Sequence, residues 1–117
     1  MPQIELSIDG RQVGFRANAL TPRLYRHQFS RDLARDLASI KKKYEKVKGD
    51  DQTFDVLDLE IFENVAYIMA KQADPEIPKT ADEWLEGFEM FSIYEILPEI
   101  LQLWRKNEET TSVPVKK

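Results

Sequence analysis

The first part of the chain alternates between apolar and polar residues. Apolar side chains occupy every second position over residues 4–8, and the alternation resumes over residues 13–15. This period indicates strands with one buried face, and the Asp9-Gly10 pair between them is a hairpin turn signal. We therefore predict a β-hairpin over about residues 3–16. Because two strands alone are marginally stable in water, the hairpin must pack on helices or extend a sheet in a neighbouring copy.

After residue 20 the spacing of apolar residues becomes that of a helix. Thr21-Pro22 matches an N-cap followed by proline at the first helical position, and Gly49 is a C-terminal stop that follows several lysines. The sequence thus predicts one long amphipathic helix between them. Its apolar stripe comprises Tyr25, Phe29, Leu33, Leu37, Ile40 and Tyr44. Its opposite face carries Arg31, Arg35, Lys42 and Lys46.

A second helix follows, and residues 61–70 are apolar around most of its circumference. That pattern is typical of a central, buried helix. Asp74-Pro75 ends it, since proline cannot continue a helix. We expect this helix to pack against the last helix of the chain. The predicted core between the two comprises Ile61, Val65, Ile68, Leu97, Ile100 and Leu101.

Two helix-start signals lie in the C-terminal third of the chain. Thr80 and Ser92 are each followed three residues later by a glutamate, and each pair can form a capping box. We predict a short third helix over about residues 81–89 and a fourth over about residues 93–106. Pro98 conflicts with a straight fourth helix because it has no amide hydrogen to donate. Either this helix kinks, or a turn over its first residues precedes the helix proper.

These elements predict an α+β fold, mostly α, with an N-terminal β-hairpin followed by about four helices in one small domain. A length of 117 residues favours a single domain. A content of 42% hydrophobic and 32% charged residues is ordinary for a globular protein. We assign residues 1–107 to this domain. Residues 108–117 are polar and lack periodicity, so we expect a flexible C-terminal tail there.

Charge is divided unevenly along the chain, although the net charge is only −4. Residues 22–48 carry nine Lys/Arg against three Asp/Glu, a balance of +6. Residues 49–109 carry four against sixteen, a balance of −12. Two such segments can attract each other within a subunit or between copies. The basic helix face could also meet phosphates, but because the chain is acidic overall we expect a solvated face or an acidic protein partner.

The sequence offers little support for catalysis or for a cofactor. It contains no cysteine, and no motif places a serine or carboxylate beside its single histidine, His27. Its four scattered glycines form no phosphate-binding loop. The acidic pair Asp50-Asp51 lies in no EF-hand pattern and suits a solvated loop. We expect a protein that is not an enzyme and that uses no cofactor and no metal.

No apolar run approaches the roughly 20 residues needed to span a bilayer. The N-terminus also lacks the basic and then apolar pattern of a signal peptide. We therefore expect a cytoplasmic protein without a membrane partner.

Several short segments occur in an order that resembles a known protein family, and the resemblance covers about residues 3–107. These segments are IELSIDG at 4–10, TPRLYRHQFSRDL at 21–33, LEIFENVAYIMA at 59–70, EWLEGF at 83–88 and IYEILPEILQLW at 93–104. In this order and in a chain of this length, they resemble the small tail assembly chaperones of phages and prophages of Gram-positive bacteria, those with long, non-contractile tails. Each segment is aliphatic and degenerate, so the order and the length carry the resemblance.

The resemblance implies a non-enzymatic role in the cytoplasm of the bacterial host. Such chaperones are thought to coat the apolar tape-measure protein until the tail-tube protein polymerises around it. They tend to self-associate, and their genes often give a longer frameshifted product, which would join here after the main domain. The implied partners are therefore the tape-measure protein, the major tail-tube protein and further copies of the chain.

The family supplies no catalytic or ligand motif, so candidate partner contacts come from the charge and aromatic pattern alone. They are Arg31, Arg35, Lys42, Lys46, Tyr25, Phe29 and Trp104. The competing function is a small nucleic-acid-binding phage regulator that uses the basic face of the first helix. Its affinity for nucleic acid would fall steeply with salt.

Overall fold

The predicted hairpin is confirmed. In the computed structural model, which describes residues 3–49, 56–90 and 92–103, strand β1 (Gln3–Ile8) pairs antiparallel with strand β2 (Arg11–Arg16). Asp9 and Gly10 have φ angles of 55° and 78°, as a two-residue type I′ turn requires. The hairpin packs on the central helix of the molecule rather than standing alone. Phe15 is its most deeply buried residue, with no exposed surface.

The turn geometry predicts which residues are tolerated at position 10. Gly10 has a positive φ, and a Cβ added to it would have no atom within 4 Å, so a larger residue would be strained there but its Cβ would not clash. We expect Gly10→Val to lower the free energy of unfolding by about 1 kcal/mol, measured by urea denaturation. Gly10→Asn should retain most of the stability, because asparagine tolerates this conformation. Equal losses in the two variants would contradict the turn geometry.

The prediction of one long helix between Thr21 and Gly49 is wrong. The structure has two helices there, α1 (Leu20–Phe29) and α2 (Leu33–Gly49). Ser30 lies between them in the left-handed conformation, with φ 58°, and its amide donates to the carbonyl of Arg26 at 2.8 Å. This contact ends α1 in the way glycine commonly does.

A new helix start follows at once, because Asp32 serves as the cap of α2. Its carboxylate accepts a hydrogen bond from the backbone amide of Arg35 at 3.3 Å, as an N-cap residue does. The start of α1 also differs from the prediction. Asn18 accepts from the amide of Leu20 at 3.0 Å. Thr21 is buried and donates to Gln72 instead of serving as the N-cap.

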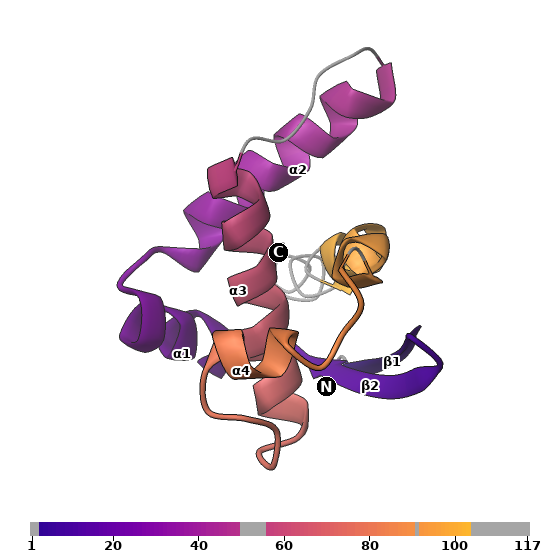
Figure 1. The fold of residues 1–117 in the computed structure, drawn as a ribbon. Helices are drawn as coiled ribbons and strands as arrows, with labels where there is room; N and C mark the ends of the chain where they lie inside the picture. Colours follow the sequence, from indigo (N-terminus) through magenta and orange to yellow (C-terminus); the bar gives the residue numbers. More distant parts are fainter. Residues whose placement is uncertain (1–2, 50–55, 91, 104–117) are drawn as a thin grey trace, which may run out of the picture.

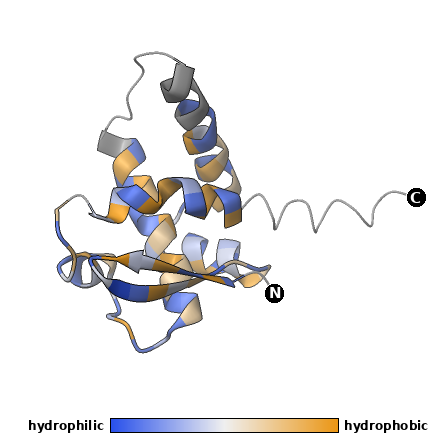
Figure 2. Cartoon of the chain, turned by 90° about the vertical axis from the view of Figure 1, so that its right-hand side faces the viewer, coloured by the Kyte–Doolittle hydropathy of each residue, from blue (hydrophilic) through white to orange (hydrophobic). Residues whose placement is uncertain are grey.

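Helix α3 (Val56–Ala73) is the central, buried helix that the apolar run predicts. Every residue over 65–70 is buried. Figure 1 shows α3 passing through the middle of the molecule, with α1 on one side and the hairpin on the other. Hydrophobic and hydrophilic residues alternate around α2 in Figure 2, as expected for a helix with one face on α3.

The short third helix begins where its capping signal predicts. In α4 (Ala81–Leu85) the Thr80 hydroxyl accepts from the amide of Glu83 at 3.2 Å. The helix ends at Leu85, earlier than the expected end near residue 89. It follows a connector that is tied to α3, since the Tyr67 hydroxyl donates to the carbonyl of Pro78 at 2.5 Å.

The second of the two alternatives for Pro98 is correct. A 3₁₀ helix, η1 (Ser92–Ile96), precedes an α-helix that the structure describes over residues 97–103. Pro98 lies in the first turn of that helix, where no intrahelical donor is needed. Ser92 does not form the expected capping box with Glu95. Its hydroxyl donates to the carboxylate of Asp9 in the hairpin turn.

One hydrophobic cluster joins the hairpin, α1 to α4 and the C-terminal helix. All six residues predicted as the core between the second and last helices are buried in it: Ile61, Val65, Ile68, Leu97, Ile100 and Leu101. The α+β class, mostly helical with an N-terminal hairpin, is therefore confirmed, although the break at Ser30 raises the number of helices to about five. In the part of the chain that the structure describes, no helix is long and apolar enough to cross a membrane. The expected C-terminal tail lies outside the described residues.

Candidate functional site

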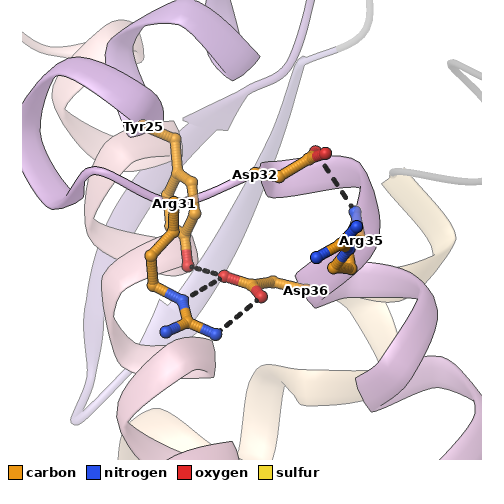
Figure 3. A network of polar contacts seen from close by, with 5 residues as sticks. All are labelled: Tyr25, Arg31, Asp32, Arg35 and Asp36. Atoms are coloured by element: carbon orange, nitrogen blue, oxygen red, sulfur yellow. Dashed lines mark hydrogen bonds and ion pairs between the residues drawn. The ribbon is translucent and has the colours of Figure 1, made fainter.

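The junction between α1 and α2 is held by a buried carboxylate. Asp36, on the first turn of α2, has its side chain among residues from both helices (Figure 3). The Tyr25 hydroxyl donates to Asp36 Oδ2 at 2.7 Å. Arg31 donates from Nε to the same oxygen at 2.7 Å and from Nη2 to Oδ1 at 3.0 Å. This two-pronged guanidinium–carboxylate contact fixes both the distance and the plane of the groups.

The electrostatics of this network keep it in one protonation state. Burial by itself raises the pKa of Asp36, but the hydrogen bonds from Arg31 and Tyr25 outweigh it, so that pKa lies below its ordinary value. Burial and then the Asp36 carboxylate raise the pKa of Tyr25, whose hydroxyl therefore remains a donor. Asp36 is thus a carboxylate that clamps the junction, since all three groups already have partners.

The network changes the interpretation of two predicted contact residues. Tyr25 has no exposed surface, so no partner reaches it in this conformation. Arg31 does not lie on a helix face opposite the apolar stripe. It belongs to the connection between α1 and α2, and its guanidinium is held on Asp36.

The other predicted contacts are spread over several environments. Arg35 and Lys42 are exposed on α2, and Phe29 is half-buried with its ring 5.3 Å from that of Tyr25. Trp104 and the side chain of Lys46 lie outside the part of the chain that the structure describes. The structure therefore gathers Tyr25, Phe29 and Arg31 at the α1–α2 junction, whereas Arg35 and Lys42 follow the outer face of α2.

A basic groove lies beside this junction. It measures about 510 Å³, and its lining includes Pro22, Arg26, Ser30, Arg31 and Leu33. Its Arg26 side chain is exposed, whereas Arg31 is paired with Asp36 and Asp32 carries the opposite charge. Arg26 is therefore the cation that the groove offers to an acidic peptide or protein surface.

A second groove, called here the β2–α4 groove, lies between β2, the end of α3, the connector after it and α4. It measures about 300 Å³. Its apolar lining comprises Val13, Ala70, Ile77, Pro78, Trp84 and Phe88, and its polar lining includes Arg11, Asp74 and Glu83. The Arg11 guanidinium carbon lies 4.7 Å from the centre of the Phe88 ring, and Nη2 donates to the carbonyl of Gly87 at 2.5 Å.

A smaller apolar recess of about 130 Å³ lies between α2, α3 and η1, with Ile40, Phe62 and Leu97 in its lining. Tyr94 borders it, and its hydroxyl donates to the carboxylate of Glu63. Burial, followed by the neighbouring Glu63, raises the pKa of Tyr94 to about 12. This side chain is a structural donor at neutral pH.

Among the described residues, no group of three or more His, Asp or Glu could hold a metal ion. His27 is exposed on α1, and the pair Asp50-Asp51 lies outside the described residues.

The β2–α4 groove was not predicted from the sequence. Its lining joins residues from β2, the end of α3, the connector after it and α4, which no local sequence pattern connects. A comparison with protein-family models gives no match, and comparisons with curated proteins and with solved structures give none either.

Proposed function

We propose that this protein is a tail assembly chaperone of a phage or prophage with a long, non-contractile tail. In this role it binds the tape-measure protein in the host cytoplasm and assists assembly of the tail tube, without catalysing a reaction. The observation that carries the proposal is the ordered series of segments over residues 3–107, which resembles that family. The hairpin and the succession of helices occur in the order that the series implies.

The surface chemistry is compatible with binding amphipathic protein segments. The β2–α4 groove offers apolar walls, and the basic groove at the α1–α2 junction offers positive charge. An amphipathic helix is commonly recognised by apolar grooves through a few anchor side chains. The two grooves lie on different elements, so one chain could contact a client and another copy at the same time.

Co-expression tests the proposed function. The chain should raise the soluble fraction of the tape-measure protein encoded with it and should co-purify with it. An unrelated acidic protein of similar size serves as the control for nonspecific effects of charge. If the soluble fraction is unchanged and no complex is recovered, the proposal is wrong.

We also predict self-association in which the basic segment of one copy meets the acidic part of another. The side chain to reverse is Arg35, because reversing Arg31 would leave the buried Asp36 without its partner. Arg35→Glu should weaken the association about threefold to tenfold, as expected for an exposed charge at an interface. Sedimentation velocity at low salt measures this, and high salt should have the same effect.

Lys79→Glu is the matched control for this prediction. It changes the net charge by the same amount, and Lys79 is exposed outside the basic segment. Equal weakening in the two variants would show a general effect of charge. A strict monomer at high protein concentration and low salt would refute the prediction.

A further inference from the structure

The β2–α4 groove has an apolar wall whose shape is set by the core. Trp84 forms part of this wall and is only 5% exposed. Its ring is in contact with three others, with centroid distances of 6.4 Å to Phe15, 5.7 Å to Tyr67 and 5.1 Å to Phe88. Because these rings hold Trp84 in place, the wall does not need to be ordered when a ligand binds. Such preorganisation reduces the entropic cost of binding.

The two ends of the groove differ in charge. Along β2, Arg11 contacts Gly87 and Phe88 at one end. Gly14 approaches Ala73, the last residue of α3, at the other, where Asp74 follows. The Arg11 donor Nη2 is already used by a carbonyl of the protein itself. At this end the Arg11 cation is therefore engaged by groups of the protein itself.

The carboxylates of the groove are much less engaged than Arg11. Glu83 is exposed, and among the described residues no hydrogen bond to its carboxylate is found. Asp74 uses one carboxylate oxygen to accept from the amide of Glu76 at 3.0 Å. The surrounding segment 74–89 carries six Asp/Glu against one lysine. This excess of negative charge beside an apolar wall attracts cationic ligands.

We propose that the β2–α4 groove binds a short amphipathic segment of the client protein, with an apolar side chain against Trp84 and a lysine or arginine facing Asp74 and Glu83. The client's identity as a tape-measure protein rests on the proposed function, but the chemistry of the groove does not. Charge complementarity selects this occupant, because Asp74 and Glu83 would repel an acidic segment. Like-charge contacts of this kind suppress wrong partners. The cation of the lining, Arg11, already donates to a backbone carbonyl and lies over the Phe88 ring.

Two synthetic peptides test the proposal. Both have leucines at helical spacing; one carries lysines at the remaining positions and the other carries glutamates. The emission of Trp84, measured in a Trp104→Phe background, reports occupancy of the groove. The lysine peptide should bind at least about tenfold more tightly than the glutamate peptide. Equal affinities would overturn the proposal.

Variants locate the binding on the protein. The double reversal Asp74→Lys/Glu83→Lys should weaken binding of the lysine peptide about tenfold. The double reversal Glu95→Lys/Glu99→Lys is the matched control, since both residues are exposed outside the groove lining. It should change the affinity by less than about twofold. The same loss in both double variants would mean that net charge alone attracts the peptide.

Val13→Trp fills the groove while leaving its charges in place, because Val13 is a half-buried residue of the lining. Because this variant adds a second tryptophan to the groove, its binding is measured by the anisotropy of a dye-labelled lysine peptide. Binding should be abolished, with an unchanged thermal unfolding curve. If the variant is less stable, the charge reversals decide the result. Sedimentation of the Asp74→Lys/Glu83→Lys variant should change no more than that of Glu95→Lys/Glu99→Lys, which removes the same charge from the acidic part of the chain. A larger shift to monomer would assign the groove to a second copy and overturn the proposal.

Co-expression with the tape-measure protein separates this proposal from the proposed function. If the wild-type chain and Val13→Trp raise the solubility of the tape-measure protein equally, the groove proposal fails and the function stands. If the wild-type chain has no effect on that protein but binds the lysine peptide through Asp74 and Glu83, the function fails and the groove proposal stands. If both proposals are correct, the wild-type chain should solubilise the tape-measure protein. Val13→Trp and Asp74→Lys/Glu83→Lys should then lose this effect, and the control Glu95→Lys/Glu99→Lys should keep it.

Discussion

Replacing Leu101 with alanine is expected to lower the free energy of unfolding by about 2–5 kcal/mol. Leu101 is 8% exposed and lies in the C-terminal helix, next to the fully buried Ile100. Truncation removes apolar contacts and leaves a cavity that the helix cannot close without moving. Urea denaturation monitored by circular dichroism measures the loss. The midpoint should fall while the dependence on urea stays unchanged.

Gln102→Ala is the control for this prediction. Gln102 is the next residue of the same helix and is exposed, so its replacement should change stability by less than about 0.5 kcal/mol. If Leu101→Ala is as stable as the wild type, the C-terminal helix is not docked in solution. Its apolar face would then be available to a partner.

Local sequence signals predicted the hairpin and the central helix well. Asp9-Gly10 specifies the turn because both residues accept positive φ, and the alternation on each side specifies which face is buried. The central helix follows from the apolar residues at 61–62, 65–66 and 68–70, which cover most of the circumference and are typical of a buried helix. Thr80 also marked the true start of α4. In each case, neighbours along the chain determine the conformation.

The break between α1 and α2 could not be predicted from spacing. Phe29 and Leu33 are four residues apart, so the apolar pattern continues across Ser30 as if the helix did. The residue in the left-handed conformation is a serine, although glycine is the usual occupant of that position. Asp32 was the available signal, because aspartate before a helical run is a good N-cap. The prediction of one helix followed the apolar periodicity and did not use this signal.

The same break explains why the predicted basic face was partly wrong. In a continuous helix Arg31 and Asp36 would be five residues apart and would not face each other. In the structure the non-helical connection turns Arg31 back onto Asp36.

The β2–α4 groove could not be predicted from local sequence signals either. Its carboxylates and its aromatic wall come together only when β2, α3 and α4 pack.

Replacing Asp36 with asparagine is expected to lower the free energy of unfolding by about 2–3 kcal/mol at pH 7. The substitution keeps the size of the side chain but removes the charge that holds Arg31 and Tyr25. Loss of one partner from a buried ion pair costs about 3–5 kcal/mol. The expected value is lower because the Arg31 side chain is 42% exposed and regains water.

Asp32→Asn is the matched control, since it makes the same change of charge four residues earlier. Asp32 is exposed and accepts one hydrogen bond, from the amide of Arg35. Asparagine caps helices about as well as aspartate does, so the expected change is less than about 0.5 kcal/mol. Equal losses in the two variants would contradict the clamp at the α1–α2 junction.

The pH dependence of the Asp36→Asn effect gives an independent check. The folded state holds the pKa of Asp36 below its ordinary value, so the unfolded chain takes up a proton first as the pH falls. The stability from this carboxylate is therefore fully present above the unfolded pKa of about 3.9. It is lost as the pH falls through the lower, folded pKa. The stability difference between wild type and Asp36→Asn should stay constant from about pH 7 to pH 5 and shrink below about pH 4. A difference that keeps its full size in acid would show that packing, and not the charge of Asp36, secures the junction between α1 and α2.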